Sequence, residues 1–329
     1  RLRTRDGQAW PGGRLALRQR AQGDQAVSTS LRADHIDLAA LTAIATHLPL
    51  GSATHGWLAR LQPAGQVRDL DASWQGAYPG AAAYRASGRV EGLHLAGEDS
   101  GLMSSHGPYP LPGRPGIRNA TAELAFDQDG GRARLQVQDG ALELPGVFED
   151  SVLPLQRLQT EARWTIRGER IDVQLDRFSL ANADAQGSGR LRWHTSDPLT
   201  ASAGSRFPGV LDLTATLNRA DATRVHRYLP LNLGEPVRHY LREAVQAGHA
   251  ERVDFRLRGE IWDMPFNTPG TDGEFQIGAA LREVDFDYVP AYLQADGDRP
   301  CRRGPGRRGR RTRTAGRGQD ERQPPNEGH

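Results

Sequence analysis

The sequence predicts a mainly β protein with a few helices, built as a long antiparallel meander. Segments of alternating apolar and polar residues follow one another along the chain, and turns such as Asp129-Gly130-Gly131 separate them. The predicted helices and strands do not alternate regularly, so the sequence does not indicate a parallel sheet. Aromatic residues make up only 6% of the 329 residues, whereas 38 are Gly and 21 are Pro, which favours many short strands over a thick core.

The first 75 residues predict a hairpin, two helices and a strand. Residues 12–33 contain two alternating runs that can pair. Asp37 is a typical N-cap for a helix that carries apolar residues to Ala45, and a second short helix covers Trp57 to Leu61. An apolar series from Val67 to Trp74 predicts the next strand.

The middle of the chain predicts strand after strand, with a loop rich in Gly, Ser and Pro over residues 97–115. In the first of these strands, we expect Gly88 and Gly92 to interrupt the pairing. The expected strands cover 84–95, 117–126, 133–137, 155–166, 171–180, 189–193 and 211–217.

A helix and a strand are predicted between Tyr228 and Phe266. Glu235 and Pro236 suit the first turn of a helix, because Glu favours the positive end of the helix dipole and Pro needs no donor there. Gly248 is expected to cap this helix in a left-handed conformation. The strand after it continues through Ile261 until Pro265. Helical elements are therefore expected near 37–62 and 221–248.

The basic residues are concentrated in the tail. All 42 basic residues of the chain are Arg, and ten of them lie in residues 299–329 beside three acidic residues. The rest of the chain therefore has about five more acidic than basic residues, which argues against nucleic acid as a partner. Residues 1–298 are expected to form the folded segment, and the tail to be disordered. Because GC-rich DNA that is read out of frame typically encodes Arg, Gly and Pro, we also hypothesise that the tail is a frameshift product.

No motif predicts catalysis, a metal site or a cofactor. Ser104-Ser105-His106 lies in a loop, and Gly187-Ser188-Gly189 lacks the turn from strand to helix that a hydrolase nucleophile needs. The His residues do not have metal-ligand spacing. Asp285 and Asp287 are expected to form a polar strand edge and not an acid–base pair.

The remaining candidate site is a stripe of apolar side chains on one face of successive strands. Two arrangements account for it: the core of a two-layer sandwich, or an open trough whose apolar face binds a ligand. The residues expected to line the trough are Leu135, Val137, Trp164, Ile166, Val173, Leu175, Leu211, Leu213, Leu217, Val253, Phe255 and Leu257.

Several motifs, in this order and spacing, resemble the YhdP branch of the AsmA-like proteins. The resemblance covers roughly residues 15–290, and the Arg-rich tail departs from it. Its motifs are Leu48-Pro49-Leu50, Pro110-Leu111-Pro112-Gly113, Leu142-Glu143-Leu144-Pro145, Trp164 with residues 178–185, and Tyr228-Leu229-Pro230 followed by a helix and a strand to Pro265-Phe266.

The resemblance implies an elongated, taco-like β groove in the periplasm of a Gram-negative bacterium, tethered to the inner membrane by one N-terminal helix. No apolar run here approaches the ~20 residues of a membrane span. Because the chain begins with Arg1, we expect an internal fragment whose anchor lies upstream.

The function implied by the resemblance is that of a segment of a non-enzymatic carrier of phospholipid between the two membranes. Its expected partners are phospholipid acyl chains and, through the anchor, the membrane. The alternative is a TamB-like scaffold for outer-membrane protein assembly or envelope integrity, in which exposed strand edges pair with client strands. A glycan hydrolase is disfavoured, because no pair of carboxylates is suitably placed.

Overall fold

A computed structural model describes residues 13–22, 25–46, 52–76, 83–104, 107–266 and 270–288. All of these residues belong to one compact unit, Arg1–Pro290. The predicted tail, 299–329, lies outside the described residues, as do the expected boundary at residue 298 and the Leu48-Pro49-Leu50 motif.

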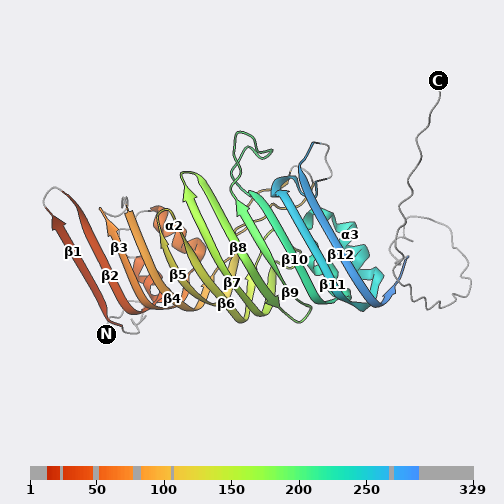
Figure 1. Ribbon diagram of the computed structural model, residues 1–329, viewed down its shortest axis with the longest axis horizontal. Coiled ribbons are helices and arrows are strands. Elements are labelled where there is room, and N and C mark those ends of the chain that lie inside the picture. The colour runs from red at the N-terminus through yellow and green to blue at the C-terminus, as the bar shows by residue number, and fades with distance from the viewer. Residues whose placement is uncertain are drawn as a thin grey trace, which may run out of the picture. The chain divides into compact units, whose positions relative to one another are not determined.

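The unit contains one sheet of twelve strands in sequence order, and each strand is antiparallel to the next (Figure 1). This confirms the predicted meander. The strands are β1 Leu15–Gln22, β2 Gln25–Asp37, β3 Ala64–Gln75, β4 Ala83–Leu95, β5 Gly116–Asp127, β6 Gly130–Glu143, β7 Val152–Arg167, β8 Arg170–Ala181, β9 Ala185–His194, β10 Val210–Asp221, β11 Val245–Glu260 and β12 Gly273–Phe286.

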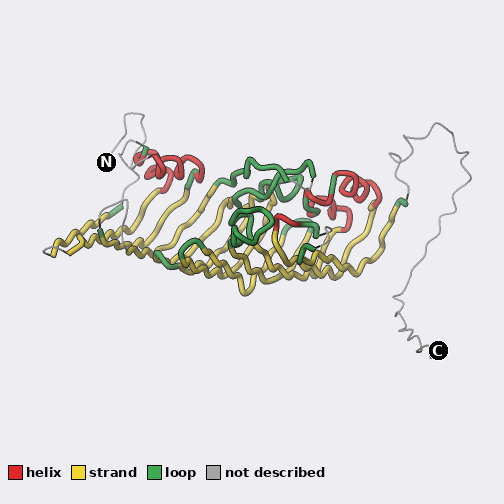
Figure 2. Tube along the Cα trace, turned by 90° about the horizontal axis from the view of Figure 1, so that it is seen from above, coloured by secondary structure: helices red, strands yellow, loops and turns green. Residues whose placement is uncertain are grey.

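The α-helices lie at one end of the strands, which we call the helix end. Helices α1 Leu38–Ala45 and α2 Ser52–Leu61 connect β2 to β3. The 3₁₀ helices η1 Ala222–Tyr228 and η2 Leu231–Leu233, followed by α3 Glu235–Ala244, connect β10 to β11. Figure 2 shows the helices and long loops along one side of the sheet. We call the opposite end of the strands the hairpin end.

The starts of α1 and α3 agree with the sequence predictions, whereas α2 starts at Ser52, before the expected Trp57. The Asp37 carboxylate accepts a hydrogen bond from the Ala40 N–H at 2.8 Å, so Asp37 caps α1 as expected. Helix α3 begins at Glu235, with Pro236 in its first turn. Both helix starts depend on residues that are neighbours in the sequence, so the sequence alone is enough to predict them.

The predicted end of α3 was wrong. The helix ends at Ala244, and Val245 already belongs to β11, where it pairs with Phe286. Gly248 lies inside the strand at a change of register, and a Cβ there would be 2.8 Å from the Val284 side chain. Pairing with a distant strand therefore displaces the cap that the local sequence favours. Similarly, β11 ends at Glu260, and Ile261 starts the short helix η3 Ile261–Asp263 instead of continuing the strand.

Bulges keep the apolar residues of several strands on one face. In β3, Val67 and Leu70 lie three positions apart, and the register with β4 shifts between Arg68 and Asp71. Asp69 adopts a positive φ of 51° at this shift. Gly92 forms a similar bulge in β4: its φ is 60°, and the register with β5 shifts between Val90 and Leu93. The interruption predicted at Gly92 is therefore a bulge within a continuous strand.

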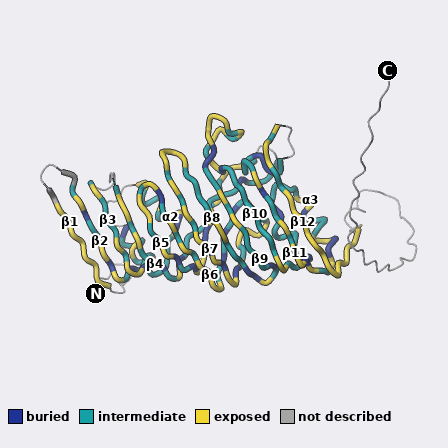
Figure 3. The backbone as a smooth tube through the Cα atoms, in the orientation of Figure 1, coloured by how far each residue is buried: buried dark blue, intermediate teal, exposed yellow. Residues whose placement is uncertain are grey.

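The packed core lies toward the helix end of the sheet. The side chains of Ala120 and Val137 are fully buried, and Leu155 is 2% exposed. Leu38 of α1 packs against the same cluster, so this helix covers part of the apolar face. The outermost strands, β1 and β12, are mostly exposed (Figure 3).

Glu143 fastens the loop between β4 and β5 to the core. Its carboxylate accepts hydrogen bonds from the Gly97 N–H, at 2.6 Å, and from the Arg118 guanidinium. Burial alone would raise the pKa of Glu143, but these two donors lower it overall. This loop thus has a charged attachment point as well as apolar contacts.

Over the described residues, no second sheet faces the first. The two-layer sandwich that the residues alone left open is therefore excluded for this part of the chain. The sheet is an open one that curls only weakly, so it resembles a shallow trough more than a closed groove.

Candidate functional site: the apolar face of the sheet

Cross-strand pairing aligns the apolar residues of neighbouring strands on one face, because residues directly opposite each other point the same way. Leu175 of β8 faces Leu191, which in turn faces Leu213 of β10. The row continues through Leu257 to Phe275 of β12. A single line of apolar side chains therefore crosses five strands.

A second row, closer to the hairpin end, is aromatic. Phe126 of β5 faces Gly131, which faces Trp164 of β7. Trp164 faces Val173, and Val173 faces Trp193 of β9. By this register and the alternation along each strand, all twelve residues predicted from the sequence lie on the same face. Whether they bind a ligand remains a prediction.

The exposure of these side chains divides the face into a closed and an open part. Val137 has no exposed surface and belongs to the core, and Leu257 is only 8% exposed. The other ten predicted residues are half-buried. At the hairpin end, Phe126 is 37% exposed and, on β12, Ile277 is 43% exposed. The face is thus closed toward the helix end of β5 to β7 and around Leu257, and it is half-buried over most of the other positions, which we call the open part.

The sequence prediction missed several members of the open part, chiefly on β9 and β12. Trp193 and Leu191 were placed in a strand but not assigned to the face. In β12, the alternation of Phe275, Ile277 and Ala279 was a usable signal for a strand that begins at Gly273. Only the end of this strand, at Asp285, was predicted from the sequence.

Two glycines make room for large rings on this face. A Cβ on Gly131 would lie 2.5 Å from the Trp164 indole and 2.5 Å from the Phe126 Cβ. A Cβ on Gly189 would lie 2.6 Å from the Phe178 ring. The rings therefore lie against glycine backbone of the next strand, which leaves room for them on the apolar face.

Aromatic residues from two loops lie over the hairpin end of β9 to β12. Phe207 stacks on Trp193 with ring centroids 6.1 Å apart, and the Trp193 indole donates to the Pro208 carbonyl at 2.9 Å. The Phe266 ring lies against Gly259 and Gly273. The apolar surface of these strands is therefore bordered at both ends.

The opposite face of the sheet is charged. Arg89 of β4 lies 3.0 Å from Glu123 of β5, Glu123 lies 3.9 Å from Arg134 of β6, and Arg134 lies 2.8 Å from Glu161 of β7. These pairs are exposed, so each adds little to stability. Together they keep one face of the sheet in water, which leaves only the other face for an apolar ligand.

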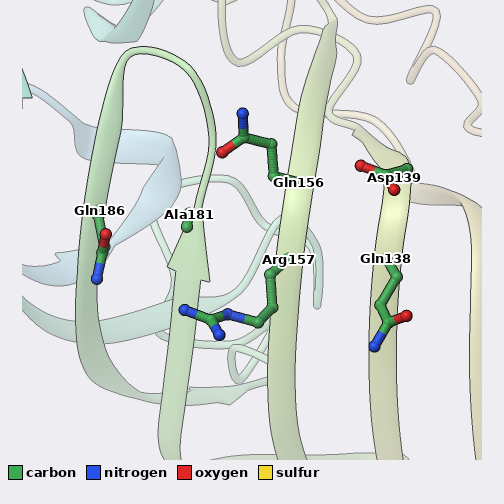
Figure 4. A pocket seen from close by; sticks show the side chains of 6 residues that line it. All are labelled: Gln138, Asp139, Gln156, Arg157, Ala181 and Gln186. Atoms are coloured by element: carbon green, nitrogen blue, oxygen red, sulfur yellow. The ribbon is translucent and has the colours of Figure 1, made fainter.

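A shallow hollow of about 360 Å³ lies on the charged face (Figure 4). Its lining is polar, and its position across the sheet from Val137 and Leu158 separates it from the apolar face. It is therefore not part of the candidate site. The lining residues are Gln138, Asp139, Gln156, Arg157, Ala181 and Gln186.

A comparison with family models gives a match to the family described as YhdP protein, over residues 1–293. The chain belongs to the YhdP family. This confirms the resemblance found in the sequence motifs. Neither a curated protein nor a solved structure matches the chain.

The two serine-containing motifs of this YhdP-family chain are not placed by the structure in a catalytic site. Gly187-Ser188-Gly189 lies within β9, not in a turn before a helix. Ser105 and His106 lie outside the described residues. In the part of the chain that the structure describes, no group of three His, Cys, Asp or Glu residues is placed to hold a metal ion. Among the same residues, no helix combines the length and apolar character of a membrane span.

Proposed function

We propose that this chain is a segment of a bridge-like phospholipid carrier of the periplasm, in which acyl chains lie on the open part of the apolar face. Lipid would pass between the inner and outer membranes in a protein that is tethered to the inner membrane. The chain would act without catalysis or a cofactor. The observation that carries the proposal is a continuous, half-buried apolar surface on a single sheet whose other face is charged.

The energetics suit acyl chains. Burial contributes roughly 0.8 kcal/mol for each methylene group, so about a dozen buried groups contribute on the order of 10 kcal/mol. This attraction has no preferred direction, which permits a chain to slide from one strand to the next. Twelve strands at a spacing of about 4.8 Å make the surface roughly 50 Å wide across the strands.

The second candidate function is a scaffold for outer-membrane protein assembly. The observation that favours it is β12, a strand of 14 residues that pairs only with β11 among the described residues. Its free edge offers backbone donors and acceptors to a client strand. The two functions would use different groups of the protein. A client strand would pair with the backbone of β12, whereas an acyl chain would contact the side chains of Leu213 and Phe255.

The test is the lipid content of the purified full-length protein. We expect mass spectrometry of a solvent extract to detect bound phospholipid with the wild type and at least a tenfold loss with Leu213→Asp and with Phe255→Asp, since each places a charge on the apolar face. Arg192→Asp is the matched control, because Arg192 is an exposed residue in β9 between Leu191 and Trp193.

The two functions predict opposite results. Phospholipid that is present in the wild type and in Arg192→Asp, but lost from the two apolar-face variants, supports the carrier. If the wild type carries no phospholipid, or if Leu213→Asp and Phe255→Asp retain it in full, the carrier proposal is wrong. The scaffold then becomes the better account.

A further inference from the structure

Arg238 is a buried cation with few partners. It lies on α3, and only 9% of its side chain is exposed. Its Nη1 donates to the Leu231 carbonyl at 2.8 Å, but its Nε has no hydrogen-bond partner. A buried guanidinium normally pairs all or most of its donors, because an unpaired buried donor or charge is costly.

One carboxylate serves both Arg238 and its neighbour Arg242. Glu149 accepts a hydrogen bond from Arg242 Nη2 at 2.9 Å, and the same oxygen lies 3.9 Å from Arg238 Nε. Glu149 is thus hydrogen-bonded to Arg242, and Arg238 has no carboxylate within hydrogen-bonding distance among the described residues. The nearby Arg227 is already paired with Asp150 and so does not compete for Glu149. The group formed by Arg238, Arg242 and Glu149 therefore has one positive charge in excess.

The two arginines of this group, which we call the arginine pair, form part of a polar border at the helix end of the strands: both lie on α3, which precedes β11, and Glu149 lies in the loop after β6. Arg242 and Glu149 have side chains that are 41% and 42% exposed, so a ligand can reach them from solvent. Tyr240 lies two positions from each arginine and so on another side of α3, where it packs edge-to-face on Phe286 of β12 with ring centroids 6.0 Å apart and holds the helix beside the last strand. A lipid whose acyl chains lie on the face has its head group near such a polar border.

We propose that the arginine pair binds the phosphate group of a lipid whose acyl chains lie on the apolar face. This inference rests on the proposed carrier function and adds a preference for phosphate-bearing lipids. Guanidinium groups form paired, charge-assisted hydrogen bonds to phosphate oxygens. A phosphodiester carries one negative charge, which matches the excess charge of the pair, and its oxygens can accept from the donors that Glu149 leaves free.

The experiment compares two lipids that share acyl chains and differ in phosphate. The full-length protein is incubated with vesicles that contain labelled phosphatidylglycerol and diacylglycerol in equal amounts, and the retained ratio is measured. The wild type should favour phosphatidylglycerol. Arg242→Gln should lower the ratio about tenfold without changing retained diacylglycerol, since a hydrogen bond between charged groups is lost.

Two further variants separate binding from folding. Glu149→Gln should raise the ratio, because it removes the carboxylate that competes with phosphate, whereas a merely structural role for Glu149 predicts no gain. Arg252→Gln is the control: Arg252 is also paired with a carboxylate, Asp254, but lies in β11 with its side chain 66% exposed. It should leave the ratio unchanged.

Each contrary result is distinguishable. An unchanged ratio in both Arg242→Gln and Glu149→Gln overturns the phosphate site while leaving the carrier intact, provided that diacylglycerol is still retained. Binding of inorganic phosphate alone, as tight as that of the lipid, overturns the assignment to a lipid head group. Retention of neither lipid by the wild type refutes the carrier function itself.

Discussion

At the scale of single residues, Gly131 controls how the aromatic row is built. Its missing side chain admits the Trp164 indole, which crosses from the neighbouring strand. We expect Gly131→Ala to lower the free energy of unfolding by about 1–3 kcal/mol, because the added methyl group collides with Phe126 and Trp164. Chemical denaturation measures the change.

Gly278 provides the control for Gly131. It also lies in a strand, β12, but a Cβ there would have no atom within 4 Å. Gly278→Ala should therefore change the free energy of unfolding by less than about 1 kcal/mol, and in the stabilising direction. Equal effects of the two substitutions would show that Gly131 does not accommodate the indole.

Tyr228 is the residue whose titration reports on the contact between η1 and the sheet. Its hydroxyl donates to Asp184 at 2.9 Å and accepts from Asn182 at 2.9 Å. Burial, reinforced by the Asp184 carboxylate, raises the pKa of Tyr228 to about 12. An unfolded tyrosine ionises near pH 10. Between these values the folded protein keeps a proton that the unfolded chain has lost, so stability falls as the pH rises from about 10 to 12.

Tyr228→Phe should remove this pH dependence. At neutral pH, the variant should be less stable by about 1–2 kcal/mol, because Asn182 loses its acceptor. Between pH 10 and 12, its stability should fall less steeply than that of the wild type in denaturant titrations. Tyr84→Phe controls for the loss of one tyrosine, since Tyr84 is 41% exposed. Parallel pH profiles for the wild type and Tyr228→Phe would contradict this account.

The sequence predicts which face of the sheet a side chain lies on better than it predicts how deeply that side chain is buried. Alternation placed Leu213 and Phe255 on one face, because a strand repeats every two residues. It did not distinguish Val137, which is fully buried, from Leu135 on the same strand, because burial depends on the loops and helices that cover each position. The arginine pair was not predicted either, since Glu149 and Arg242 are 93 residues apart.

At the scale of elements, bulges determine which residues share a face. Asp69 gives β3 one extra residue, so Val67 and Leu70 both reach the apolar face although they lie three positions apart. Positive φ disfavours most side chains and suits Gly, Asn and Asp. The sequence pattern gave no warning of this, because a bulge is visible only against the partner strand.

Two changes at Asp69 test the bulge. Asp69→Gly should preserve the fold and change the free energy of unfolding by no more than about 1 kcal/mol, since Gly adopts positive φ without strain. Deletion of Asp69 should destabilise the protein by at least about 3 kcal/mol, because a one-residue shift moves Leu70 and Trp74 to the charged face. Thermal and chemical unfolding would measure both. A mild effect of the deletion would mean that β3 tolerates either register.

Long-range pairing also explains the errors in element boundaries. The cap expected at Gly248 rests on local propensity, but Val245 gains a strand partner, Phe286, from a part of the chain 41 positions further on. The starts of α1 and α3 depend on nearby groups, such as the Asp37 carboxylate, and were predicted correctly. Ends that depend on a distant strand were not.

At the scale of the whole sheet, the two faces have opposite characters. One face carries exposed ion pairs, such as that of Arg134 and Glu161, and the other carries rows of apolar side chains with no second sheet over them among the described residues. The meander and its amphipathic faces were predictable, because period-two alternation persists through successive strands. The weak curl was not, because curvature arises from twist and bulges along the sheet.

The most direct test of the central claim is site-specific photocrosslinking of lipid to the two faces of the sheet. A photoreactive amino acid is placed at Val173 or Leu213 on the apolar face, or at the adjacent Gln174 or Asp212 on the charged face; all four positions are half-buried. After irradiation of the full-length protein in cells, we expect mass spectrometry to find phospholipid adducts at Val173 and Leu213 and none at Gln174 and Asp212. Equal labelling of both faces, or adducts at neither, would contradict the claim that acyl chains lie on the apolar face.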